Sequence, residues 1–206
     1  MKKQGELIPS NMRYSYISLT TVLLLVGCGS THYVYKQSHI ISHPFQAPRL
    51  QTSTKYAYLD AVNTMRSHGR RCGSLGYFSS APALQWNDAL YHAAYEHSAD
   101  MLESNAFQHG GSSTRSDWTA QVQHLGRASN FKERIENNGY KKWKRLAQNI
   151  ASGMHTVKDT MQQWQLSEHH CANIMNPVFT DFGMAHTKKK GERFSDYWTQ
   201  NFAAHQ

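Results

Sequence analysis

The spacing of hydrophobic residues changes along the chain, and each change marks a different kind of segment. An uninterrupted apolar run, ISLTTVLLLV, occupies residues 17–26. Residues 55–66 and 155–167 carry apolar side chains three or four positions apart, a period that predicts helices with one buried face. Residues 182–188 and 194–203 instead follow the period of a strand, which predicts an antiparallel hairpin at the end of the chain.

A further helix is predicted to begin after Asn87, because Asn is a favourable N-cap and an acidic residue follows it in the first turn. We expect Glu96, Asp100 and Glu103 of this helix to point away from the core. Its predicted buried face consists of Leu90, Ala93, Ala94, His97 and Met101. The predicted core positions of the other two helices are Tyr58, Leu59, Val62, Met65, Val157, Met161, Trp164 and Leu166.

Helices followed by a hairpin, whose turn is predicted at Lys190-Gly191, indicate an α+β domain. We assign this domain to residues 53–206, a length that suits one ordinary domain of about 150 residues. The preceding segment, residues 28–52, is polar, contains Pro44 and Pro48, and shows no sustained apolar period. It is therefore predicted to be a tether.

The apolar run near the N-terminus is too short to cross a membrane as a helix. It has ten residues, whereas a transmembrane helix needs roughly 20. Basic residues precede the run and Gly27 follows it, so residues 1–27 are predicted to be a secretory signal peptide. Met12 is an alternative start, because Met12-Arg13 alone would supply the basic part of the signal.

The predicted cleavage site, Leu25-Val-Gly-Cys28, resembles the lipobox of bacterial lipoproteins. The resemblance implies that Cys28 becomes the lipidated first residue of an exported protein, anchored to a membrane without crossing it. Gly29 at the next position implies the outer membrane if the cell is Gram-negative. Three acyl chains, at ~0.8 kcal/mol per buried methylene group, would hold such an anchor firmly.

The formal net charge of +8 favours anionic partners, such as lipid headgroups, cell-wall polymers and lipopolysaccharide. Basic residues cluster at 139–145 and 187–193, and we interpret both clusters as solvated loops that keep the domain soluble. No nucleic-acid-binding motif accompanies them, so nucleic acid is not expected as a partner. We expect the domain to be a monomer.

Two cysteines remain once Cys28 is assigned to lipid. An exported compartment is oxidising, so a disulfide is the default expectation for Cys72 and Cys171. The alternative is a pair of buried free thiols, which the residues themselves leave open. A bridge would close a loop of about 100 residues.

Three motifs together resemble the CAP superfamily, also called the SCP domain. They are PALQWNDALYHAAYEHSADMLESNAFQHGG at residues 82–111, AQNIASG at 147–153, and WQLSEHHCANIMNPVFTDFGMA at 164–185. Their order and separation resemble the bacterial branch of the family over residues 56–202. The resemblance implies an α-β-α sandwich, in which a small antiparallel sheet lies between helical layers.

The best-known feature of that family is a cleft of two His and two Glu, which binds a divalent metal in some members. The resemblance places the two His on His109 and His170, and the two Glu on Gln148 and Ser167, the latter as is usual in the bacterial branch. Zinc held by His109 and His170 alone would lack the third protein ligand that a stable site usually has. Glu168 is adjacent, and we expect it to point to solvent.

Two functions remain open at this stage. The first is an exported, lipid-anchored and non-catalytic module that binds a lipid or another envelope component. The alternative is a metal-assisted hydrolase acting on peptide or cell-wall substrates, which would need His109 or His170 as a general base. We expect His97 in the core, and His169 to point about 100° away from its neighbour His170 on a helix.

Overall fold

A computed structural model describes residues 39–189 and 196–206. The predicted signal peptide, Cys28, the first part of the tether and the turn at Lys190-Gly191 lie outside the described residues. Within the described ranges, none of the helices is long and apolar enough to cross a membrane. Residues 38–206 form one compact unit.

The described part of this unit contains seven helical elements and six strands. In chain order these are α1 (Thr52–Arg66), β1 (Arg70–Arg71), η1 (Gly73–Leu75), β2 (Tyr77–Phe78), β3 (Gln85–Trp86), α2 (Asp88–Ser104), α3 (Trp118–Val122), α4 (Phe131–Asn137), β4 (Trp143–Ser152), α5 (Val157–Leu166), α6 (Glu168–Met175), β5 (Asp181–Lys188) and β6 (Asp196–His205).

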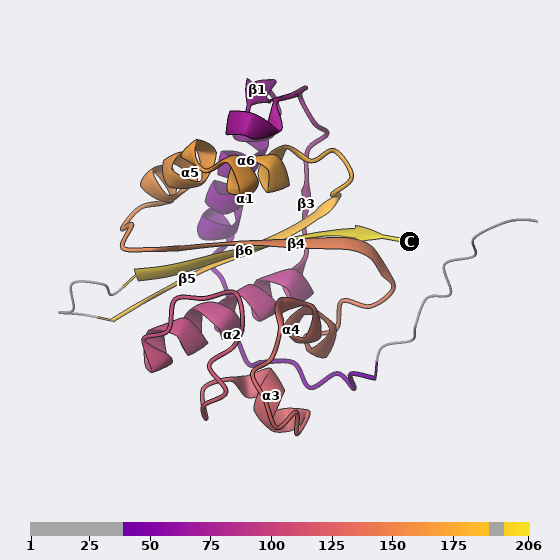
Figure 1. The fold of residues 1–206 in the computed structure, drawn as a ribbon, viewed down its shortest axis with the longest axis vertical. Helices are drawn as coiled ribbons and strands as arrows, with labels where there is room; N and C mark the ends of the chain where they lie inside the picture. Colours follow the sequence, from indigo (N-terminus) through magenta and orange to yellow (C-terminus); the bar gives the residue numbers. More distant parts are fainter. Residues whose placement is uncertain (1–38, 190–195) are drawn as a thin grey trace, which may run out of the picture. The chain divides into compact units, whose positions relative to one another are not determined.

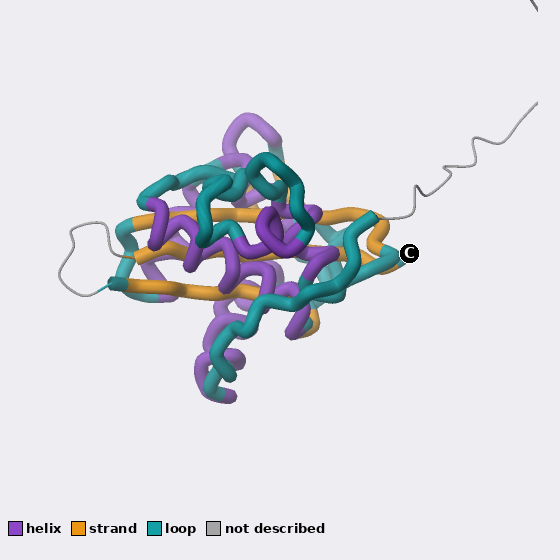
Figure 2. The backbone as a smooth tube through the Cα atoms, turned by 90° about the horizontal axis from the view of Figure 1, so that it is seen from below, coloured by secondary structure: helices purple, strands orange, loops and turns teal. Residues whose placement is uncertain are grey.

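A four-stranded sheet in the order β3-β5-β6-β4 lies between two helical layers (Figure 1). The predicted hairpin is β5 and β6, which pair antiparallel. β4, which the hydrophobic pattern did not predict, pairs antiparallel with β6 and forms one edge of the sheet. Helices α1, α5 and α6 cover one face, and α2 and α4 cover the other (Figures 1 and 2). The predicted α+β fold, an α-β-α sandwich, is confirmed.

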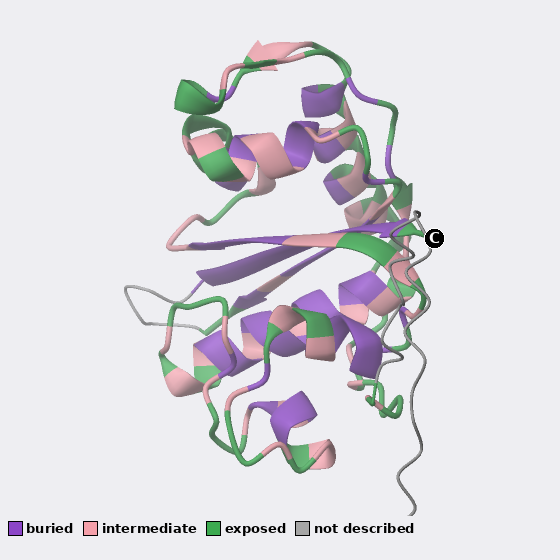
Figure 3. Ribbon diagram, turned by 45° about the vertical axis from the view of Figure 1, so that its right-hand side comes forward, coloured by how far each residue is buried: buried purple, intermediate pink, exposed green. Residues whose placement is uncertain are grey.

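The two largest apolar clusters attach the helical layers to the sheet. Because helices cover both faces, β6 is buried from Asp196 to Ala204, so both sets of its alternating side chains lie inside the protein (Figure 3). The larger cluster joins α1, α5 and α6 to the sheet and includes Val62, Trp164, Ile174, Phe182 and Phe202. The cluster under α2 and α4 consists of Leu90, Ala93, Ile135, Tyr140 and Ala203.

The predicted start of α2 is confirmed. The side chain of Asn87 accepts hydrogen bonds from the backbone N–H groups of Ala89 and Leu90, two donors that the first turn of a helix leaves without partners. α4 is held in the same way by a capping box, in which Asn130 and Glu133 each bond to the backbone of the other. This box was not predicted.

Two predicted orientations on α2 are wrong. Glu96 and Asp100 are buried, because both carboxylates accept hydrogen bonds from the segment that follows the helix. Polar side chains can occupy a core when such donors replace water. The prediction of Leu166 as a core residue is also wrong. It is 81% exposed and is the last residue of α5, before the backbone becomes extended at Ser167.

The last part of the predicted tether lies along the domain. The backbone N–H groups of His43 and Phe45 donate to the side chains of Asn137 and Asn138 at the end of α4. Further along, the Tyr91 hydroxyl donates to the carbonyl of Pro48 at 2.7 Å. These bonds fix where the chain enters the folded unit.

Candidate functional site

The predicted cleft residues come from three separate elements. His109 lies in the segment after α2, Gln148 lies on the edge strand β4, and His170 lies on α6. The structure brings His109 and Gln148 into hydrogen-bonding contact, and His170 is close enough for His109 to influence its protonation. The fourth predicted position, Ser167, lies one residue before α6.

The backbone of His109 is held by a buried arginine. Arg134 on α4 is 1% exposed and donates from Nη2 to the carbonyl oxygen of His109 at 2.6 Å and from Nη1 to that of Ser129 at 3.0 Å. Two residues after His109, a side chain at Gly111 would place its Cβ 2.1 Å from Oδ2 of Asp117. Only glycine therefore lets this segment close over the buried carboxylate.

A chain of side-chain amides sets the proton position on His109. Asn201 Nδ2 donates to the carbonyl of Leu90, and Gln148 Nε2 donates to Asn201 Oδ1, each at 3.1 Å. A backbone carbonyl can only accept, so this order orients both amides and places Gln148 Oε1 against His109 Nδ1, also at 3.1 Å. Nδ1 of His109 is therefore the donor in this hydrogen bond, which leaves Nε2 as the ring nitrogen that faces a ligand.

His170 is a neutral imidazole at pH 7. Its pKa lies below the usual 6.5, first because burial disfavours the charged form and then because of the electrostatic effect of the nearby His109 and His169. The carbonyl of His170 accepts a hydrogen bond from Asn149 Nδ2 at 3.2 Å, and Asn149 Oδ1 accepts one from Asn173 Nδ2 at 2.9 Å. These amides tie α6 to β4.

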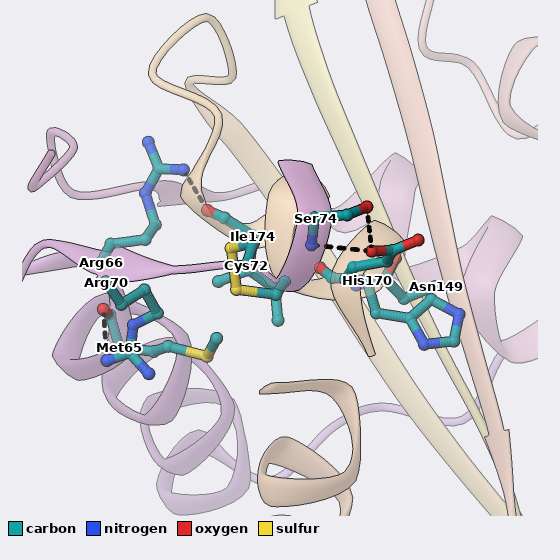
Figure 4. Close-up of a disulfide and its surroundings, with 10 residues drawn as sticks. Met65, Arg66, Arg70, Cys72, Ser74, Asn149, His170 and Ile174 are labelled. Atoms are coloured by element: carbon teal, nitrogen blue, oxygen red, sulfur yellow. Dashed lines mark hydrogen bonds between the residues drawn. A yellow bond between two sulfur atoms is a disulfide. The ribbon is translucent and has the colours of Figure 1, made fainter. Parts of the chain in front are cut away.

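The two residues before His169 lie at the junction between α5 and α6. Ser167 has an extended backbone, and its side chain does not cap α6. No hydrogen bond joins Ser167 to His170 within the described residues. The side chain of Glu168 is partly exposed, and its Oε2 accepts from the backbone N–H of Ser74 at 3.0 Å and from the Ser74 hydroxyl at 2.6 Å (Figure 4).

The cleft does not fit a stable divalent metal. It offers two imidazoles and the Gln148 amide oxygen, which is uncharged and already accepts from His109. Within residues 39–189 and 196–206, no group of three or more His, Cys, Asp or Glu side chains is placed to hold an ion. Stable zinc sites usually have three or four such ligands.

The structure contains the predicted disulfide. Cys72 and Cys171 are joined with a Cα–Cα distance of 5.4 Å, and they are 1% and 0% exposed (Figure 4). Cys171 directly follows His170, so the bridge ties the cleft helix to the segment after α1. Glu168 reinforces the same junction through its bonds to Ser74.

Two other histidines of the motifs, His97 and His169, lie where they were expected. His97 is fully buried, and its Nε2 lies 2.9 Å from the carbonyl oxygen of Gln108, next to His109. His169 has 77% of its side chain exposed. Neither histidine belongs to the cleft.

Sequence reasoning missed the polar residues that position His109. Arg134, Asn201, Asp117 and Glu96 are all buried, and none of them follows a hydrophobic period. The one local signal was the Gly-Gly pair after His109, which indicates a close backbone approach. It does not tell which distant residue approaches.

We predict that Glu96→Gln gains stability relative to the wild type as the pH rises from 4.5 to 7.5. Burial raises the pKa of Glu96 from 4.5 to about 7, so the folded protein keeps a proton that the unfolded chain has lost. The resulting stabilisation is present below pH 4.5 and is lost by pH 7, an effect of about 3 kcal/mol at ~1.36 kcal/mol per unit. Urea unfolding of both proteins at several pH values measures it.

The matched control for this measurement is Glu103→Gln, an exposed position of the same helix. Because His97 is present in all three proteins, its own titration cancels in the differences. A stability difference between Glu96→Gln and wild type that stays constant with pH would contradict the prediction.

Residues 59–202 match the family model described as "CAP: Cysteine-rich secretory protein family". Two Bacillus subtilis (strain 168) proteins are similar in sequence. "Uncharacterized membrane protein YlbC" is 25% identical over 155 residues, which are 75% of this chain and 35% of that protein. "Uncharacterized protein YkwD" is 28% identical over 119 residues, 58% of this chain and 38% of that protein. The matched segments thus span less than two-fifths of either relative.

Two solved structures share the fold. An extracellular protein containing an SCP domain from Bacillus anthracis has a TM-score of 0.53 at 20% identity, over 77% of this chain and 45% of that one. An outer surface protein from Borrelia burgdorferi has a TM-score of 0.55 at 15% identity, over 81% of this chain and 100% of that one. Three of these four similar proteins are thus described as extracellular, surface or membrane proteins. With a family model that covers most of the chain and the fold of an α-β-α sandwich, this chain belongs to the CAP, or cysteine-rich secretory protein, family.

Proposed function

We propose that this chain is an exported, lipid-anchored CAP-domain protein that acts as a non-catalytic binding module of the cell envelope. The lipobox-like Leu25–Cys28 segment supports the anchor. Relatives described as extracellular, outer surface and membrane proteins support an envelope location. Lipid or an anionic envelope component is the partner, in keeping with the net charge of +8.

One observation carries the non-catalytic part of the proposal: Gln148 stands against His109 where an acidic residue would supply charge. A carboxylate there would strengthen a metal site or a general base, whereas an amide fixes the imidazole without adding charge. The result is a site in which His109 is oriented by a neutral amide. Such a site suits binding a polar group of a ligand more than it suits hydrolysis.

For the alternative, a metal-assisted hydrolase, the described residues do not supply a nucleophile with a base and a group that orients the base. A nucleophilic serine needs a base within hydrogen-bonding distance and a third group that orients the base. Ser167 makes no bond to His170 in the described structure, and the nearest acidic side chain along the chain, Glu168, is held by Ser74.

We predict that Ser167→Glu gives the cleft a zinc affinity that the wild type lacks. A carboxylate at this half-exposed position would add the third ligand to His109 and His170 without disturbing the amide chain. We expect calorimetry on the compact unit, residues 38–206, to show binding at least tenfold tighter than in the wild type. Ser167→Gln, which matches the shape without the charge, is the control.

The opposite result is equally informative. If the wild type binds zinc more tightly than micromolar, and His109→Ala and His170→Ala each abolish that binding, the hydrolase becomes the better explanation. If Ser167→Glu and Ser167→Gln behave alike, the two histidines do not converge on a common ion.

A further inference from the structure

The described chain begins beside α4 and the start of β4, and hydrogen bonds hold it there. Lys141 Nζ donates to the carbonyl of Ile40, and Gln123 Nε2 donates to the carbonyl of Ile41. The hydroxyl of Ser42 donates to the carbonyl of Glu136 at 3.4 Å. The point at which the chain enters the domain is therefore a defined place on its surface, seen at the lower right of Figure 1.

Five basic residues belong to the elements beside this entry point, and one of them, Lys141, contacts the entering chain directly. We call them the basic face; its members are Lys132 on α4, Lys141 and Lys142 just before β4, and Lys144 and Arg145 at its start. Lys142, Lys144 and Arg145 are exposed, and their side chains form no hydrogen bond or ion pair within the described residues. The structure corrects the interpretation of residues 139–145 as a solvated loop. β4 begins at Trp143, so residues 143–145 belong to a strand.

The acidic groups near the basic face are few and engaged. Glu133 pairs with Arg127, with Nη1 and Oε2 at 2.9 Å. Glu136 is 2% exposed and accepts from the Trp143 indole at 2.9 Å. Asp181, at the start of β5, accepts from the Tyr140 hydroxyl at 3.0 Å. The face therefore keeps a clear excess of positive charge.

An apolar side chain accompanies these charges. Ile41 is 70% exposed, and its own carbonyl is held by Gln123. An exposed apolar side chain beside lysine and arginine suits the boundary between lipid headgroups and acyl chains, where both kinds of side chain find a favourable environment.

We propose that the basic face, together with Ile41, is the surface with which the domain lies on an anionic membrane. His39 is eleven positions after Cys28, a reach of at most ~40 Å, so an anchor at Cys28 would keep the entry point close to the bilayer. Each lysine or arginine near such a surface strengthens binding a few-fold, and salt screens the effect. The proposed orientation of the domain on the membrane rests on the proposed anchor at Cys28. The proposed affinity of the basic face for anionic lipid does not.

The test uses residues 38–206, the compact unit, which lacks Cys28 and therefore carries no covalently attached lipid. We expect it to sediment with vesicles of phosphatidylcholine and phosphatidylglycerol (3:1) at 50 mM salt, and to bind pure phosphatidylcholine at least tenfold more weakly. The variant Lys142→Gln/Lys144→Gln/Arg145→Gln should lose at least tenfold of the binding to anionic vesicles. The control Arg71→Gln/Lys158→Gln/Lys188→Gln removes the same charge from exposed positions on other elements and should lose less than threefold.

Equal losses in the two triple variants would overturn the proposal, because the attraction would then belong to the net charge rather than to one face. Equal binding to both kinds of vesicle would overturn it as well, as would binding to dextran sulfate without binding to anionic vesicles. The anchor is tested separately on the full chain, by palmitate incorporation that Cys28→Ala abolishes. Failure of one measurement therefore leaves the other intact.

Discussion

Arg66→Met is expected to lower the free energy of unfolding by about 4 kcal/mol, the largest effect of any single substitution considered for this protein. Arg66 ends α1 and is fully buried. Burial lowers its pKa to about 10, so it remains charged at pH 7. Its guanidinium group donates to four backbone carbonyls, those of Pro82, Ile174, Asn176 and Phe179.

The physical reason for the large effect is that methionine can fill the space but cannot donate. Ile174 lies in the last turn of α6, where backbone carbonyls have no partner inside the helix (Figure 4). The positive charge also lies at the negative end of that helix. Each buried carbonyl left without a donor costs about 1–3 kcal/mol, and local rearrangement recovers part of the sum.

Arg66→Lys is the matched control, because it keeps the charge but cannot reach four carbonyls at once. Its expected loss is intermediate, about 2 kcal/mol. Urea unfolding at pH 7 measures both variants. The prediction fails if Arg66→Met loses less than about 1 kcal/mol, since water would then satisfy the carbonyls as well as the arginine does.

Removal of the disulfide is expected to cost about 2–4 kcal/mol in the variant Cys72→Ala/Cys171→Ala. The bridge joins residues 99 positions apart, and a loop of that length strongly restricts the unfolded chain. Because Cys171 follows His170 on α6, we also expect the cleft helix to exchange its amide hydrogens faster in this variant. Hydrogen exchange and urea unfolding measure the two effects.

Reduced wild type is the control for the loss of the two sulfur atoms. If the bond itself stabilises the fold, reduced wild type and the double variant will be about equally stable, and both will fall below the oxidised protein. Equal stability of oxidised and reduced wild type would show that packing alone holds α6 in place.

The separate parts of the fold followed from local patterns. The helical period identified the cores of α1 and α5, an N-cap identified the start of α2, and alternation identified β5 and β6. These signals exist because each element must present an apolar face to the core and must satisfy its own terminal backbone groups. β4 escaped prediction because its exposed first half carries lysine and arginine.

The cleft was predicted in part. Resemblance to the family motifs named His109, Gln148, Ser167 and His170, and the structure joins the first two through a hydrogen bond. The resemblance could not show that Gln148 orients His109 rather than leaving a gap in a metal site. That role depends on Asn201, a residue 53 positions away that reaches Gln148 only across the sheet.

By itself, the amino-acid sequence determined the helical cores of α1 and α5, the start of α2 and the strands β5 and β6. It also determined that two cysteines were available for a bridge, and which family motifs the chain carries. Only the tertiary structure decided that Glu96 and Asp100 are buried, that Arg66 satisfies the end of α6, and that Lys141 holds the entering chain beside the start of β4. The difference has a physical reason. Apolar periods depend on neighbours along one element. The residues that contact a buried polar group, or that lie near a surface charge, are often far away in the sequence.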